Sequence, residues 1–227
     1  MIPDRSAPRG RGRIAVRGWL YDRLLAGLTA GWYRAVLTRL PDRARVLDVG
    51  IGTGGAVTRC AELVRAKDLR IEGVDIDRDY LERCASGLSR AGLDEHVSTC
   101  LASVYDHRGG PYDAVYFSAS LMLLPDPVGA LTHVAKQLEP TGQMFFTQTF
   151  HHRRSRLVEK LKPMIRHVTT IHFGRVTYED EFRAALVDAG LELVEFVELK
   201  STRHASACLA VACVQGKEQG DLMPFAA

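Results

Sequence analysis

The chain has 227 residues, of which 46% are hydrophobic and 25% charged, and its formal net charge is +3. This composition is typical of a globular protein and too apolar for a disordered one, and no apolar run approaches the roughly 18 residues of a membrane-spanning helix. The five cysteines include no C-x-x-C pair. We therefore expect reduced thiols without disulfides, no zinc or other metal site, and a cytoplasmic protein.

The positive charge is concentrated in two segments. Residues 1–17 hold five arginines against one aspartate, and residues 151–167 hold six lysines or arginines against one glutamate. A general nucleic-acid-binding protein is usually basic across its folded surface, so we expect no DNA partner. We expect a disordered basic tail over residues 1–17, in which a short organellar targeting peptide stays open, and a flexible C-terminal tail over residues 217–227.

Apolar spacing from Trp19 to Leu28 and from Trp32 to Leu40 predicts two short helices separated near Gly31. Alternating strands and helices follow. The expected strands are Arg45–Val49, Arg70–Val74, Val97–Leu101, Asp113–Ser118 and Gln143–Thr149, and the expected helices are Gly55–Val64, Asp77–Ala91 and Pro127–Leu138. Strands that alternate with helices imply right-handed crossovers and a parallel sheet.

The C-terminal part has a different pattern. A helix over Tyr178–Ala189 precedes the predicted strands Leu193–Glu198 and Ala205–Val214. The link of about six residues between these strands is too short for a helical crossover, so the pair should be an antiparallel hairpin. The sequence thus predicts one α/β domain over residues 18–216, with a Rossmann-like, doubly wound, seven-stranded sheet that is mostly parallel.

A glycine-rich stretch follows the first predicted strand, where glycines let the backbone approach a ligand closely. Its residues Gly50, Gly52 and Gly55 also satisfy the G-x-G-x-x-G pattern of dinucleotide sites. Asp48 argues against that interpretation, because a carboxylate at this turn would repel a pyrophosphate. Asp48 suits a ligand that presents an ammonium and a sulfonium. Asp75, after the second strand, can accept the hydroxyls of a ribose in such a ligand and in a dinucleotide alike.

With these motifs the sequence resembles the class I S-adenosylmethionine-dependent methyltransferases. The resemblance covers about residues 21–214 and rests on three further features. These are D-x-G-x-G-x-G at Asp48, Gly50, Gly52 and Gly54, a fourth strand at Tyr112–Ser118, and a turn like L-x-P-G-G-x at Leu138–Gln143, with Thr141 in place of a glycine. The resemblance implies a methyltransferase with S-adenosylmethionine as its cofactor.

The resemblance also implies roles for individual residues. Asp48 and the Gly50–Gly54 loop would hold the methionine end, Asp75 the ribose hydroxyls, and Ile76 one face of the adenine. Ser103 and Val104 would border the adenine ring; many relatives have an aspartate where Ser103 stands, so Asp106 is a substitute candidate for the amino contact. Ser118 would lie near the transferable methyl group, and Tyr21 would act as a lid over the cofactor.

The sequence indicates the methyl acceptor less directly than the cofactor. Several small-molecule relatives place a histidine after strand four, where this chain has Leu123, so the resulting apolar wall favours an acceptor with a hydrophobic portion. His151 and His152, after strand five, are the candidates for a general base. No N-D-x-x-Y-like motif of the DNA-base methyltransferases follows strand four, which also argues against a DNA target.

Two segments are expected to cover the site: an N-terminal helical lid over residues 18–42 and a basic lid insertion over residues 151–177. The basic segment is either a solvated helix face or a mouth that attracts an anionic molecule or a lipid surface. We expect a small-molecule methyltransferase acting on an N, S or O nucleophile, as a monomer or homodimer with peripheral membrane contact left open. The alternatives are a protein or RNA methyltransferase and a non-catalytic cofactor-binding or NAD-binding protein.

Overall fold

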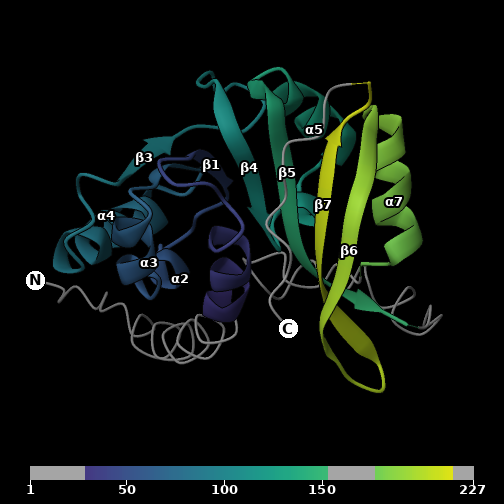
Figure 1. Cartoon of the computed structure of the whole chain (residues 1–227), viewed down its shortest axis with the longest axis horizontal. Helices are drawn as coiled ribbons and strands as arrows, with labels where there is room; N and C mark the ends of the chain where they lie inside the picture. The colour runs from purple at the N-terminus through teal and green to yellow at the C-terminus, as the bar shows by residue number, and fades with distance from the viewer. Residues whose placement is uncertain (1–28, 153–176, 217–227) are drawn as a thin grey trace, which may run out of the picture.

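The computed structural model describes residues 29–152 and 177–216. Its seven strands form one sheet in the order β3-β2-β1-β4-β5-β7-β6. Strands β1 to β5 are parallel to one another, and β7 is antiparallel to both β5 and β6. The predicted doubly wound sheet with an antiparallel C-terminal hairpin is confirmed (Figure 1). The strands are β1 (Arg45–Val49), β2 (Arg70–Asp75), β3 (Val97–Leu101), β4 (Tyr112–Ser118), β5 (Leu138–His151), β6 (Leu191–Ser201) and β7 (Ala205–Val214).

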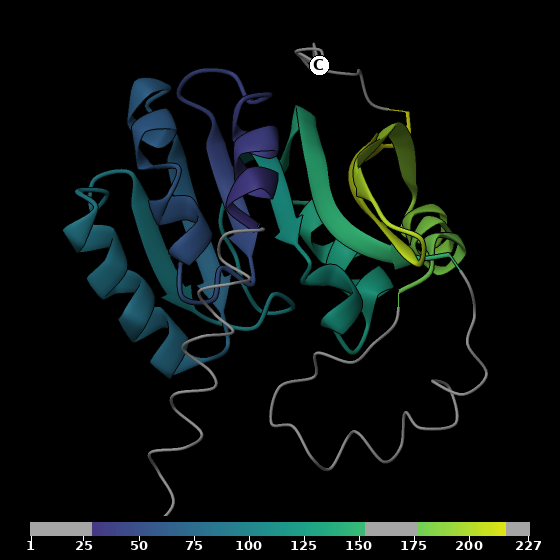
Figure 2. The same cartoon turned by 90° about the horizontal axis from the view of Figure 1, so that it is seen from below.

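Helices cover both faces of the sheet, and α2, α3 and α4 gather toward β3 while α7 lies beside β6 (Figures 1 and 2). One apolar core joins the N-terminal helix, α3 and α4 to one face, and a second joins α5 and α7 to the other. Residues 29–37 form the described part of the N-terminal helix. The other helices are α2 (Gly55–Thr58), α3 (Ala61–Ala66), α4 (Arg78–Arg90), α5 (Pro127–Ala135), α7 (Glu179–Asp188) and the short 3-10 helix η1 (Leu121–Leu123).

Local sequence signals explain where two of these helices begin. The carboxylate of Asp77 accepts a hydrogen bond from the backbone N–H of Tyr80 at the start of α4, and Asp126 accepts one from Gly129 at the start of α5. Each carboxylate satisfies a backbone donor that has no partner within the helix. No helix in the described ranges has the length and apolar character needed to cross a membrane.

Two helix predictions are corrected by the structure. The described helical residues 29–37 continue through Gly31, whose position is exposed, so the glycine lowers helix propensity there without ending the helix. The first of the two predicted helices, residues 19–28, lies outside the described ranges. The expected helix Gly55–Val64 is divided into α2 and α3. The hydroxyl of Thr58 donates to the carbonyl of Gly55, a side-chain bond that competes with the helical ladder, and Cys60 then turns out of helical geometry.

The turn predicted at Leu138–Gln143 is incorporated into β5. Tyr112 pairs with Leu138 and Ala114 pairs with Gln143, so the chain advances by five residues along β5 and by only two along β4. This irregularity accommodates the glycine at 142, where a Cβ would stand 2.8 Å from the carbonyl oxygen of Tyr112. Beyond it β5 continues to His151, and this end of the strand is paired with β7 alone.

Candidate active site

The strand order reverses between β1 and β4, and the loops that follow these two strands meet there. In open α/β sheets ligands bind at this place, beyond the carboxyl ends of the strands. The hydroxyl of Ser120, after β4, donates to the carbonyl of Val49 at the end of β1, over 2.5 Å. A Cβ on Gly50 would stand 2.9 Å from the Cβ of Ser120, so a glycine is needed for this close approach.

The loop after β1 has left-handed backbone at three glycines, with φ of 80° at Gly50, 59° at Gly52 and 65° at Gly54. L-residues with side chains rarely adopt such angles. A Cβ on Gly54 would lie 2.5 Å from the sulfur of Cys84 on α4, whereas a Cβ on Gly52 would meet nothing within 4 Å. Gly54 therefore serves packing, and Gly52 presents open backbone on the side where a ligand can lie.

Asp48 is buried beneath this loop, with 1% of its surface exposed. Its Oδ2 accepts a hydrogen bond of 2.6 Å from the hydroxyl of Tyr33 on the N-terminal helix, and its Oδ1 has no partner among the described residues. Burial raises the pKa of this carboxyl to about 7, the Tyr33 bond opposes the rise, and the charge of Asp75 adds to it. A buried carboxylate of this kind is stabilised by a cation nearby.

Asp75 stands at the end of β2 and faces the same loop. One carboxylate oxygen accepts from the N–H of Gly52 and the other from the N–H of Asp77, each at 2.9 Å. These bonds aim the carboxylate while leaving lone pairs for ligand hydroxyls. The next residue, Ile76, has 78% of its surface exposed, which gives the site an uncovered apolar platform.

The remaining predicted cofactor residues lie on neighbouring strand ends. The hydroxyl of Ser103 accepts a bond from the N–H of Tyr105 at 3.3 Å, and Val104 is 5% exposed and packs into the core. Ser118 ends β4 and is followed by Ala119, which has a φ of 56°. Strained backbone of this kind persists where surrounding contacts hold it, here a bond from the N–H of Ala119 to the carbonyl of Thr147.

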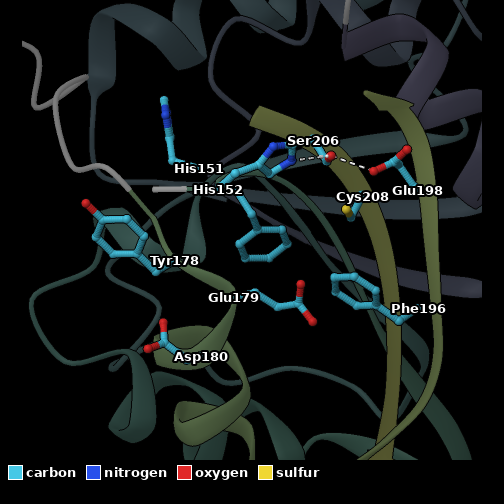
Figure 3. A pocket seen from close by; sticks show the side chains of 10 residues that line it. His151, His152, Tyr178, Glu179, Asp180, Phe196, Glu198, Ser206 and Cys208 are labelled. Carbon is cyan, nitrogen blue, oxygen red and sulfur yellow. Dashed lines mark hydrogen bonds between the residues drawn. The ribbon is translucent and has the colours of Figure 1, made fainter. Parts of the chain in front are cut away.

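Of the two predicted histidines, His151 is the last residue of β5 and His152 follows it. Thr147 pairs with Ser118, so His151 and His152 follow four and five residues later, roughly 13–17 Å along an extended strand. They line a pocket of about 420 Å³, and the close-up shows the ring of His152 turned toward Ser206 while His151 points away (Figure 3). The lining residues are Phe150, His151, His152, Tyr178, Glu179, Asp180, Phe196, Glu198, Ser206 and Cys208.

A hydrogen-bonded relay crosses this pocket. Nε2 of His152 lies 2.8 Å from the hydroxyl of Ser206, and that hydroxyl donates to Oε2 of Glu198 over 2.5 Å. Because the Ser206 hydroxyl donates its proton to Glu198, the serine oxygen accepts a hydrogen bond from the Nε2–H of His152. Nδ1 of His152 then carries the lone pair. Ser206 and, through it, Glu198 therefore fix the orientation of the His152 ring.

The predicted lids and one tyrosine lie outside the described ranges in whole or in part. Tyr21 is outside them, as is most of the 151–177 insertion. Sequence reasoning missed Tyr33, which is the tyrosine that contacts Asp48. Its position in the W-Y pair after Gly31 carries no signal of that contact, because the bond joins residues 15 positions apart on different elements.

The residues around the glycine loop fit the group that the sequence resemblance implies. The orphaned buried oxygen of Asp48 suits the cationic methionine end, the oriented carboxylate of Asp75 suits the ribose hydroxyls, and the exposed face of Ile76 suits the adenine. A pyrophosphate is negatively charged, so it offers no positive group to pair with the buried carboxylate of Asp48. The donor set thus matches S-adenosylmethionine and disagrees with NAD.

Comparisons with known proteins agree. The family model described as "Methyltransferase domain" matches residues 21–196. The chain is 26% identical to O-methyltransferase rstn1 of Aspergillus nomiae over 72% of this chain and 71% of that protein. It is 33% identical to aklanonic acid methyltransferase DauC of a Streptomyces species over 45% of this chain, and this match spans about half of that relative, 47% of its length.

Among solved structures, geranyl diphosphate C-methyltransferase from Streptomyces coelicolor, crystallised with Mg²⁺, geranyl diphosphate and S-adenosyl-L-homocysteine, superposes with a TM-score of 0.64. The superposition covers 82% of this chain and 77% of that one at 14% identity, so it supports the fold alone. The fold, the glycine loop with its two carboxylates and the family match together lead to one conclusion. This chain belongs to the class I S-adenosylmethionine-dependent methyltransferases, and S-adenosylmethionine is its cofactor.

Proposed function

We propose that this enzyme methylates an N, S or O nucleophile of a small, partly hydrophobic molecule. The observation that carries the proposal is the pocket at the end of β5, in which aromatic side chains stand beside the oriented His152. Its volume of about 420 Å³ is in the range of small-molecule sites. The names of the Aspergillus and Streptomyces relatives, an O-methyltransferase and an aklanonic acid methyltransferase, support a small acceptor.

The apolar character of the acceptor follows from two places. Phe150, Tyr178 and Phe196 line the pocket, and Leu123, just after β4, has 44% of its surface exposed. Exposed apolar groups near a site bind best to an apolar part of a ligand. We infer that the acceptor lies between Ser118, at the end of β4, and this pocket.

In this proposal His152 removes the proton of the nucleophile. Methyl transfer from a sulfonium is an in-line displacement, so the protein aligns the reactants, excludes water and accepts a proton from the acceptor. Nδ1 of His152 takes that proton, and Glu198 stabilises the resulting imidazolium through Ser206. Asp48, Gly52 and Asp75 hold the cofactor in place during the transfer.

The test is transfer of a labelled methyl group to a panel of phenols, carboxylic acids, thiols and amines. His152→Gln should lower turnover of an accepted substrate about 100-fold or more, the usual contribution of a general base, and should leave the affinity for S-adenosylmethionine unchanged. His151→Gln is the matched control and should retain activity. Full turnover in His152→Gln would show that the base lies elsewhere, and methylation of protein or RNA only would contradict the small-molecule proposal.

The basic segment at 151–167 supports a negatively charged or membrane-presented acceptor. Its net charge of +5 stands on a chain whose total is +3, and exposed charges attract over about a Debye length, roughly 8 Å at physiological salt. Replacing Arg153, Arg154 and Arg156 by Glu should raise KM for an anionic acceptor or for one presented on anionic vesicles. The effect should shrink as salt rises, with no change in the cofactor constant; a salt-independent KM would point to a neutral acceptor.

A further inference from the structure

Three side chains of different metal-binding types meet on the face of the sheet away from Asp48. They are Glu72 on β2, Cys100 on β3 and His107 in the loop of residues 102–111, and their ligand atoms all lie within 4.8 Å of one another. We propose that Glu72, Cys100 and His107 bind a zinc ion that fastens the 102–111 loop to the sheet. This is the group of three that the described residues bring within coordinating reach.

The chemistry of the three ligands suits zinc. Zinc binds thiolate sulfur, imidazole nitrogen and carboxylate oxygen with bonds of 2.0–2.3 Å, so its tetrahedral ligands stand roughly 3.3–3.8 Å apart. Nε2 of His107 and Oε1 of Glu72 are already 3.8 Å apart. The sulfur of Cys100 lies within 4.8 Å of both of these atoms, so a modest side-chain adjustment brings it to coordinating distance.

The fold places these residues together by strand register. Val74 pairs with Cys100, and Glu72 lies two residues before Val74, so both side chains stand on the same face of neighbouring strands. His107 is held over them by its backbone. Its N–H donates to the carbonyl of Ser103 at 2.9 Å, and its own carbonyl lies 2.7 Å from Nε2 of His133.

Exposure separates Cys100 from the other thiols. Cys60, Cys84, Cys208 and Cys213 are buried, while Cys100 is partly exposed, and the side chain of Glu72 is 34% exposed. Burial raises the pKa of the Cys84 thiol to about 12 and that of Cys208 to about 11, which keeps these two protonated. An ion from solvent can therefore reach Cys100, and binding releases the thiol proton to solvent.

A neighbouring tyrosine completes the arrangement. The hydroxyl of Tyr112 donates to Oε2 of Glu72 at 2.6 Å and lies 3.1 Å from Nε2 of His107. When Oε1 of Glu72 and Nε2 of His107 bind the ion, the ring proton of His107 is carried on Nδ1 in place of Nε2, the contact between His107 and Tyr112 is released, and the Tyr112 hydroxyl keeps its bond to Oε2. Outer contacts of this kind orient zinc ligands.

The experiment uses the full chain, freed of metal by chelation and titrated with Co²⁺ as a spectroscopic probe and then with Zn²⁺. We expect one ion per chain, a sulfur-to-cobalt charge-transfer band and the visible bands of tetrahedral cobalt. Cys100→Ser should abolish the charge-transfer band and weaken zinc binding at least about 100-fold, and Glu72→Gln should weaken it at least about 10-fold. Tyr112→Phe should retain the band, because the phenol is not a ligand.

Matched controls use residues of the same types outside the cluster. Cys213→Ser and His96→Gln should bind the metal as tightly as the unaltered protein, and all variants should bind S-adenosylmethionine, which reports correct folding. Cys100→Ser changes one atom at a partly exposed position, so this variant is expected to fold. Less than one ion per chain, absence of a thiolate band, or unchanged zinc affinity in Cys100→Ser would each overturn the proposal.

Discussion

Asp48 combines a binding role with a cost to stability. Its pKa of about 7 in the folded protein is about three units above the ordinary value for an aspartate. A group whose pKa is raised by folding stabilises the protein fully below its unfolded pKa, and that contribution is lost as the pH rises through the folded pKa. The ionised form of Asp48, which attracts the cationic cofactor, is thus the form that lowers the stability of the folded protein.

We therefore predict a pH-dependent effect of Asp48→Asn without cofactor. From pH 4 to pH 8 the original protein should lose on the order of 3 kcal/mol relative to the variant, since each pKa unit is about 1.4 kcal/mol. Urea unfolding at several pH values measures the difference, and other titrating groups cancel in the comparison. The variant should also bind S-adenosylmethionine more weakly at pH 8; parallel stability curves would show that Asp48 is ionised throughout.

Asp75 and Asp77 allow a matched comparison two residues apart. Asp75→Ala should weaken S-adenosylmethionine binding about 100-fold or more, because it removes charge-assisted hydrogen bonds of about 1.5–3 kcal/mol each. Asp77→Ala removes the N-cap of α4 and should cost about 1 kcal/mol of stability with little change in affinity. Calorimetry and thermal unfolding separate the two effects, and equal affinity losses would contradict the assignment of the ribose to Asp75.

At the scale of the element, the glycine loop divides its work between packing and ligand contact. Gly52→Ala and Gly54→Ala both place a side chain at left-handed φ, which costs roughly 1–2 kcal/mol. Gly54→Ala additionally drives a methyl group into the sulfur of Cys84. We predict that Gly54→Ala unfolds at lower urea than Gly52→Ala, whereas Gly52→Ala loses cofactor affinity without a clash inside the protein.

The double variant Gly54→Ala, Cys84→Ala provides the control for this loop. Removing the sulfur should restore part of the lost stability, while the backbone strain stays. If Cys84→Ala has the same effect in both glycine backgrounds, the loop and α4 are not in contact as described.

At the scale of the whole molecule, a buried ion pair connects the N-terminal helical segment to the far edge of the sheet. Nη2 of Arg39 lies 2.6 Å from Oε1 of Glu195 on β6, and the Arg39 side chain is only 2% exposed. Glu195→Gln should cost about 1.5–3 kcal/mol, because it weakens a hydrogen bond between charged groups and removes the negative charge of Glu195 beside the buried guanidinium. Chemical unfolding measures this, and Arg183 with Glu179, an exposed pair, is the control with an expected cost below about 1 kcal/mol.

Much of the architecture could be predicted because its signals are local. Turn residues and apolar runs mark each strand of the sheet, and the short link between the last two strands, about six residues by prediction and three in the structure, excludes a helical crossover. The glycine pattern with Asp48 and Asp75 predicted the family for the same reason, since each residue sits at the end of a strand. The prediction failed where competing local bonds decide, as at Thr58, whose hydroxyl bond to Gly55 accompanies the division of the expected helix.

The sequence by itself therefore determined that the sheet is mostly parallel with an antiparallel C-terminal hairpin. It also determined the cofactor class and the carboxylates that face the glycine loop. Only the tertiary structure decided which side chains meet across elements. Tyr33 reaches Asp48, Ser206 joins His152 to Glu198, and three potential metal ligands come together in a chain without a C-x-x-C pair. Such contacts depend on strand register and on loop paths through space, which no spacing along the chain encodes.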